Sequence, residues 1–174
     1  MDLQDFQPQT MYFEEPLEDR VAALIELASV SYGEGDAEQP LLQARALAPA
    51  SLTVMVALYR FYYYQHRLDD ALQVAHDVMA EVGQAIGFPE HWQMITENHL
   101  INGLVESFIT VRFYLLALKG AAFLQLRMGR RAEAVAMLNK VVEFDSKDRL
   151  GARTLLQMAG PTLVADQTAA EQVA

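Results

Sequence analysis

The chain has 174 residues, of which 52% are apolar, so it can form one domain with a sizeable core and is too apolar to be disordered throughout. It contains no cysteine, which excludes disulfides, thiol catalysis and cysteine-ligated iron–sulfur or zinc sites. Its net charge of −10 repels nucleic-acid phosphates, and no uninterrupted apolar run approaches the roughly 20 residues of a membrane span, so we expect neither nucleic acid nor membrane as a partner.

The chain begins with an acidic arm. Residues 1–38 carry ten acidic side chains and one basic side chain, a net charge of −9, whereas residues 39–165 have a net charge of +1. We expect residues 1–16 to be irregular, and the arm is either a solvated segment or a contact for a basic patch on a partner. Because the arm lacks the basic start and apolar stretch of a signal peptide, we expect a cytoplasmic protein.

Residues 17–159 have helical periodicity and are expected to form a single all-α domain. Glycine and proline residues divide this pattern into separate helices, and residues 160–174 are expected to be a flexible tail. The expected helices occupy residues 17–32, 36–48, 51–66, 68–84, 90–99, 104–128, 131–144 and 146–158.

Several expected helix ends carry capping or breaking residues. Asp36 and Gln39 have the spacing of a capping box, and Ser51 and Ser146 are expected N-caps of the helices that follow them. Asn102-Gly103 is a candidate break between the helices on either side of it.

A pattern of small residues around a turn occurs more than once. Gly129 stands at a turn with Ala134 five residues later, and His66 stands at a turn with Ala71 five residues later. The small side chain lets the two helices of a hairpin cross closely, and glycine suits a left-handed turn. A third, degenerate copy has Gly35 at its turn. The copies occupy residues 24–49, 58–79 and 122–146.

This pattern resembles the tetratricopeptide-repeat (TPR) family, whose helical hairpins recur about every 34 residues. Over residues 20–158 the resemblance implies stacked antiparallel helical hairpins, in about three degenerate repeats, with a C-terminal capping helix. The turns at His66 and Gly129 are 63 residues apart, which is longer than one period. The additional residues, 86–104, depart from the family pattern and are expected to form an inserted helix or loop.

The resemblance implies a concave groove for a protein partner, lined by the first helix of each hairpin. The residues at the family's groove positions are mainly aromatic or basic, which suits an acidic or amphipathic segment. They are Ile25, Ser29, Tyr32, Arg60, Tyr63, Tyr64, Lys119, Phe123 and Arg127. Some rings of residues 59–64 must lie in the core instead, because five aromatic residues in six helical positions cover every face. The subgroup that grips chaperone tails is not matched, since Val56 and Arg60 replace its Lys and Asn pattern.

Trp92 and Met94, in the insertion, are a candidate second contact, because Trp and Met are frequent anchors at interfaces. The alternative is that Trp92 fills the gap that the insertion makes in the core.

Nothing in the sequence points to catalysis. The four histidines, His66, His76, His91 and His99, are scattered without metal-ligand spacing, and no phosphate-binding loop or nucleophile elbow occurs. We therefore expect no enzymatic activity, no metal and no other cofactor.

The expected function is that of a protein-binding adaptor, chaperone, or assembly or protection factor for a larger complex. The chain is similar to small TPR accessory proteins encoded with nitrogenase in nitrogen-fixing bacteria, which implies a nitrogenase component as partner. It is also similar in size, charge and helical content to type III secretion chaperones, whose repeats are usually contiguous. Two alternatives of other classes are a small-ligand receptor or enzyme using a pocket beside the insertion, with His91 or His99, and a self-assembling structural protein.

Overall fold

The computed structural model describes residues 16–31 and 36–160, and the part it describes is all-helical without strands, which confirms the predicted fold class. The predicted arm and tail lie outside these residues, apart from Pro16 and Gly160. The helices are α1 (Asp19–Val30), α2 (Glu38–Leu47), α3 (Leu52–Tyr64), α4 (Leu68–Ala85), the short 3₁₀ helix η4 (Trp92–Met94), α5 (Glu97–Glu106), α6 (Phe108–Arg127), α7 (Arg131–Phe144) and α8 (Ala152–Ala159).

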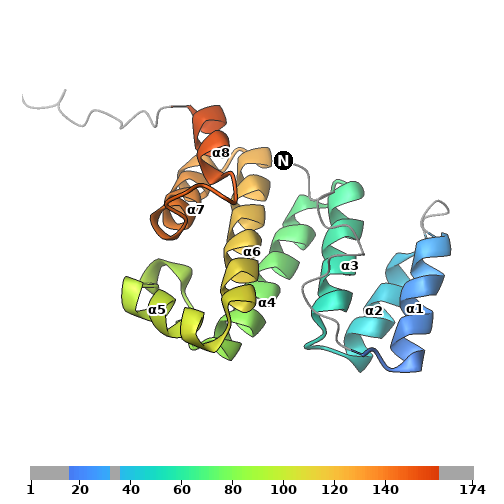
Figure 1. Ribbon diagram of the computed structural model, residues 1–174. Coiled ribbons are helices and arrows are strands. Elements are labelled where there is room, and N and C mark those ends of the chain that lie inside the picture. Colours follow the sequence, from blue (N-terminus) through green and yellow to red (C-terminus); the bar gives the residue numbers. More distant parts are fainter. Residues whose placement is uncertain (1–15, 32–35, 161–174) are drawn as a thin grey trace, which may run out of the picture.

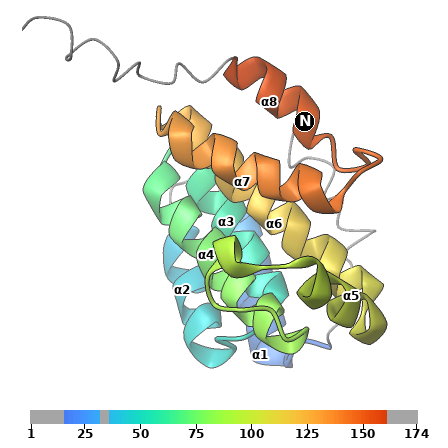
Figure 2. The same ribbon diagram turned by 90° about the vertical axis from the view of Figure 1, so that its left-hand side faces the viewer.

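Helices that follow one another along the chain pack as hairpins in a row. Helix α1 packs on α2, α3 on α4, and α6 on α7. Packing of α2 on α3 and of α4 on α6 links these hairpins. Helix α8 covers α7 at one end of the row (Figure 1). Helix α5 interrupts this order and lies to one side against α6 (Figure 2). The structure is therefore a stack of helical hairpins with one added helix.

The turns of the α3–α4 and α6–α7 hairpins have the same geometry. His66 (φ 58°) and Gly129 (φ 76°) are both left-handed, and their N–H groups donate to carbonyls three residues earlier. The next N–H groups, those of Arg67 and Arg130, each donate to the carbonyl five residues earlier at 2.9 Å. This pair of hydrogen bonds is the Schellman motif, which ends a helix with a left-handed residue. The two hairpins thus repeat the same turn 63 residues apart.

The arginine after each left-handed residue reaches the neighbouring hairpin. Arg67 Nη1 donates to Glu38 Oε1 at 2.7 Å, and Arg130 Nη2 donates to Asp69 Oδ1 at 2.7 Å. Glu38 and Asp69 each lie in the first turn of the second helix of a hairpin. The partially exposed pairs each stabilise the fold by no more than about 1 kcal/mol, so they orient adjacent hairpins rather than hold them together.

Helix α6 is at the centre of the row. It is long and apolar enough to cross a membrane by length and composition, but 61% of its apolar window is buried inside the protein. It contacts α4, α5, α7 and α8, which explains why it has apolar side chains on several faces. These contacts identify α6 as the core helix of the fold.

Two predicted caps are wrong. Helix α2 has Ala37 at its N-cap and no side-chain cap hydrogen bond, so Asp36 and Gln39 do not form a capping box. Ser146 does not cap α8, because the chain first makes turns in which Asp145 Oδ2 accepts the N–H of Leu150 at 2.7 Å. The helix begins only after the left-handed Gly151. The predicted Ser51 cap of α3 is confirmed, since its hydroxyl accepts the N–H of Val54.

The predicted break at Asn102-Gly103 is also wrong, because both residues lie inside α5. A Cβ atom on Gly103 would lie 2.8 Å from the Phe88 ring and 3.1 Å from the Val111 side chain, so glycine allows α5 to approach its neighbours closely. The break occurs instead at the extended Ser107 (φ −161°), whose hydroxyl caps α6. The predicted helix at residues 90–99 is replaced by η4 and the start of α5.

The equivalent turns predict opposite effects of two substitutions. Gly129→Ala places a Cβ atom on a left-handed residue and should lower the free energy of unfolding by about 1 kcal/mol. His66→Gly removes a Cβ atom from the equivalent residue and should raise that free energy by a smaller amount, since glycine costs more backbone entropy. Urea unfolding followed by circular dichroism measures both changes. Changes of the same sign would show that the two turns are not equivalent.

Candidate protein-binding groove

Aromatic rings of α3 and α6 gather around Tyr63. The Tyr59 ring lies parallel to that of Tyr63, with centroids 6.4 Å apart, and the Phe123 ring lies 6.3 Å away at a tilt of 41°. The Tyr64 ring packs edge-on against that of Tyr63, with centroids 5.4 Å apart. Tyr63 is half-buried and Tyr64 is exposed, so this cluster presents ring surface to solvent. Rings with one face packed and another accessible are suited to anchoring a partner's apolar side chain.

A positive charge lies beside these rings. The Arg127 guanidinium carbon lies 5.9 Å from the centre of the Tyr63 ring, and Nη1 donates to the Tyr63 hydroxyl at 3.4 Å. Arg127 is exposed at the C-terminal end of α6, where the cation also interacts favourably with the helix dipole. The guanidinium is therefore held next to an aromatic surface and can meet a carboxylate of a partner.

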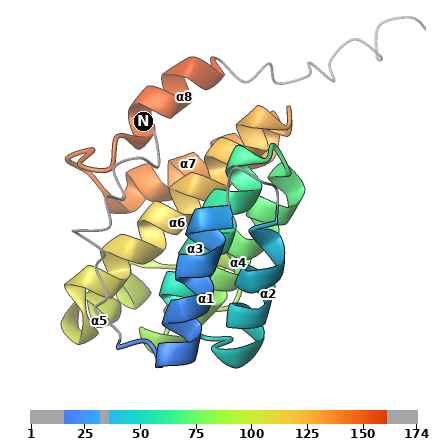
Figure 3. The ribbon, with the colours of Figure 1, turned by 90° about the vertical axis from the view of Figure 1, so that its right-hand side faces the viewer.

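A groove of about 630 Å³ adjoins the exposed Tyr64 between α1 and α3. Helix α1 packs mainly on α2 and is drawn in front of α3 in Figure 3, and the groove lies between α1 and α3. Apolar side chains, one hydroxyl and one guanidinium line it. These residues are Ile25, Ala28, Ser29, Leu41, Ala57, Arg60 and Tyr64. The structure thus places the predicted residues Ile25, Ser29, Arg60 and Tyr64 in one groove.

Lys119 does not belong to this surface, so that prediction is wrong. Its side chain is buried, with 8% of its surface exposed, and Nζ donates to the carbonyl of Leu150 at 2.7 Å. Leu150 precedes α8, so this hydrogen bond links the centre of α6 to the C-terminal end of the row. The predicted groove residue Tyr32 lies outside the described residues.

The remaining rings of residues 59–64 belong to the core, as the number of aromatic residues there predicted. Tyr59, Phe61 and Tyr62 are buried, and burial, with a smaller contribution from Tyr63, raises the pKa of the Tyr59 phenol. The neutral Tyr59 ring lies parallel to that of Tyr63 and forms the buried part of the cluster. Tyr62 has a different role, because its hydroxyl donates to Glu38 at 3.3 Å.

The predicted residues of the inserted segment lie in different surroundings. Trp92 is half-buried and packs against the core, whereas Met94 is 64% exposed. His99 Nδ1 accepts the N–H of Thr96 at 3.2 Å and forms a capping box at the start of α5, while His91 is exposed. Among the described residues, no group of three His, Asp or Glu side chains is placed to hold a metal ion.

A second apolar surface, on α5 and the start of α6, was not among the predicted sites. Five large apolar side chains are exposed there, and in the sequence they have the i, i+3, i+4, i+7, i+8 spacing of a helical stripe, although the extended Ser107 divides them between α5 and α6. They are Ile101, Leu104, Val105, Phe108 and Ile109. This spacing is readable in the sequence, but a stripe of this kind is normally buried, so exposure is the additional fact that the structure supplies.

One comparison with known proteins finds a close relative. A 19.8 kDa protein in the nifW 5′ region of Azotobacter chroococcum mcd 1 is 51% identical to this chain over 158 residues, which are 91% of this chain and 88% of the relative. No family model matches the chain, and no solved structure matches it.

The different positions of Lys119 and Arg127 can be tested by substitution. Lys119→Ala removes a buried side chain and the donor to the Leu150 carbonyl, and should lower the free energy of unfolding by about 1–3 kcal/mol. Arg127→Ala removes an exposed side chain and should change it by less than about 0.5 kcal/mol. Urea titration of both variants measures this difference. Equal stabilities would mean that Lys119 is not part of the core.

Proposed function

Since the chain belongs to the family of the 19.8 kDa protein in the nifW 5′ region, we propose that it is a non-catalytic accessory factor of nitrogen fixation, which acts in the cytoplasm by binding a nitrogenase component. The place of the relative in a nif region supports a role in nitrogen fixation. This gene context favours the nitrogenase-associated interpretation over a type III secretion chaperone.

The observation that carries the binding function is the surface around Tyr63 and the adjoining groove. Exposed ring surface, a groove of about 630 Å³ and two guanidinium groups, those of Arg60 and Arg127, adjoin one another on the first helices of successive hairpins. Aromatic residues and arginine are the residue types that contribute most to protein interfaces. The partner segment we propose is amphipathic, with apolar side chains in the groove and carboxylates near the two arginines.

The repeated hairpin supports a TPR-like scaffold for this function. The α3–α4 and α6–α7 hairpins share the left-handed turn, the following arginine and the completely buried alanine five residues after the turn, Ala71 or Ala134. Stacked helical hairpins commonly act by presenting an extended surface to another protein. A role in holding or protecting a nitrogenase component, as an adaptor or assembly factor, uses such a surface without any chemistry of its own.

Binding to purified nitrogenase component proteins tests this proposal. The wild-type chain should bind one of them, and Tyr63→Ala/Arg127→Glu should weaken binding at least tenfold, about 1.4 kcal/mol, because it removes the ring and reverses the charge. Isothermal titration calorimetry measures the affinity. Arg153→Glu is the matched control, since it makes the same charge change on α8, away from the groove. Failure of the wild type to bind any component, or undiminished binding by the double variant, would refute the proposal.

A further inference from the structure

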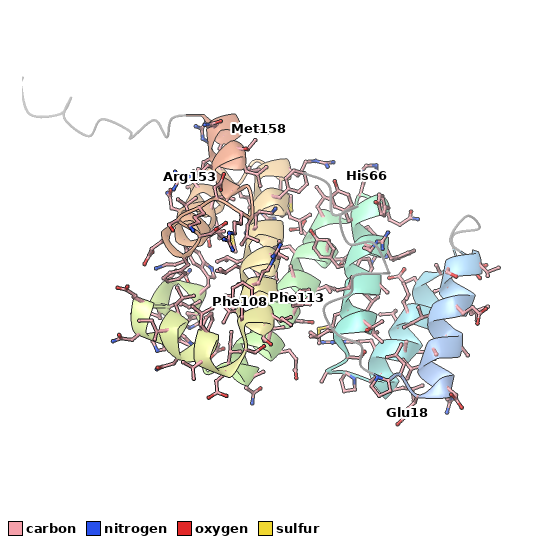
Figure 4. The ribbon with its side chains drawn as sticks, in the orientation of Figure 1. Glu18, His66, Phe108, Phe113, Arg153 and Met158 are labelled. Atoms are coloured by element: carbon pink, nitrogen blue, oxygen red, sulfur yellow. The ribbon has the colours of Figure 1, made fainter. Side chains whose placement is uncertain are left out.

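Helix α5 and the first turn of α6 form an exposed apolar surface, called here the α5 surface. Its five members, defined above, are exposed by 39% (Leu104) to 81% (Val105). Phe108 lies where α5 and α6 meet (Figure 4) and is 57% exposed. Isolated exposed apolar residues are ordinary, but these five lie on either side of the break at Ser107, and Leu104 and Phe108 line the same pocket. They therefore form a patch of the kind that marks an interaction site in a folded protein.

A pocket of about 330 Å³ opens beside this patch, between α5, α6 and the segment that follows α7. Leu104 and Phe108 belong both to the patch and to the pocket, and the buried Val111 and Leu115 contribute further apolar wall. A bulky apolar side chain of a partner that lies along α5 could therefore enter the pocket and be removed from water.

The part of the pocket formed by α6 and the segment after α7 carries an excess of positive charge. Arg112, Lys147 and Arg149 line the pocket together with one acidic residue, Asp145, whose Oδ2 already accepts the N–H of Leu150. Lys147 and Arg149 are exposed. Residues 39–165, which include the pocket, have a net charge of +1, so three basic side chains against one acidic side chain are a local excess of positive charge. This excess favours a partner that carries carboxylates.

From the apolar stripe, the pocket and this charge together, we propose that the α5 surface binds an acidic amphipathic helix of a partner protein. Its apolar face would lie on α5 and in the pocket, and its carboxylates would face Lys147 and Arg149. A second copy of this chain fits less well, because a symmetric contact would bring the positive walls of both pockets close together.

This surface is separate from the groove and does not depend on its function. Phe108 and Phe123 are 15 residues apart on α6, which places them about 22 Å apart along the helix axis. The ring cluster around Tyr63 thus lies near one end of α6 and the α5 surface at the other, and α5, the segment that interrupts the repeat, supplies the second surface.

Two synthetic peptides of about 18 residues test the proposal. One has leucine at i, i+3, i+4 and i+7 positions and glutamate at most others, and the second has lysine in place of each glutamate. Fluorescence anisotropy should show that the glutamate peptide binds the full chain at least tenfold more tightly than the lysine peptide, with affinity that falls as salt is added.

The variants Val105→Asp and Lys147→Glu/Arg149→Glu should each weaken binding of the glutamate peptide at least tenfold, while Arg127→Glu, beside Tyr63, leaves it unchanged. All three change exposed side chains, and circular dichroism checks that each variant is folded. No binding of the glutamate peptide at about 1 mM, equal binding of both peptides, or full binding by Val105→Asp would overturn the proposal. Sedimentation showing a dimer that Val105→Asp converts to a monomer would overturn it in favour of a second copy.

Discussion

The close approach of paired helices at completely buried alanines is the constraint on which the rest of this fold depends. Ala44, Ala71 and Ala134 have no exposed surface, and each lies in the second helix of a hairpin. A side chain that ends at Cβ lets the first helix approach until its own side chains fill the space between them. For Ala71 and Ala134 the left-handed turn five residues earlier sets where the second helix begins, so turn and crossing are fixed together. A larger side chain would separate the helices, and the displacement would pass to the next hairpin because the hairpins are packed in a row.

The inserted segment adds a helix without disturbing the packing of the hairpins. Between α4 and α6 the chain leaves the row, forms η4 and α5, and returns, while α4 and α6 still pack directly on each other. Gly103 allows α5 to lie close to Phe88 and Val111, and the N-cap Ser107 turns the chain into α6. The added helix therefore changes the surface of the protein without interrupting its core. This arrangement separates the groove, which uses the repeat, from the α5 surface, which uses the insertion.

Much of the fold could be predicted from local patterns in the sequence, because helix periodicity and turn residues act over a few positions. The bounds predicted for the helix at residues 131–144 are those of α7, and the turns at His66 and Gly129 were located correctly. The errors arose where tertiary contacts override local preference. Gly103 resembles a helix breaker but serves close packing, and Ser146 resembles an N-cap but lies in a turn fixed by Asp145.

The candidate site was harder to predict because it depends on which face of each helix is covered. Lys119 and Arg127 are both cations of α6, yet one is buried against the segment before α8 and the other is exposed beside Tyr63. Sequence spacing alone does not separate them, since α6 has neighbours on several sides. The α5 surface was missed for the opposite reason, because its apolar stripe has the spacing of residues that are normally buried.

The position of α1 at the end of the row has a consequence for dynamics. Helix α1 packs mainly on α2, and α2 provides most of the contact with α3, so the first hairpin can separate from α3 while the hairpins around α6 remain packed. In a protein built from stacked units, such local opening requires less free energy than global unfolding, and its backbone amides exchange with solvent sooner. The groove lies at the boundary that opens. A segment bound between α1 and α3 would hold the first hairpin against α3 and slow amide exchange in α1 and α2. The exchange rates of these two helices would therefore report whether the groove is occupied.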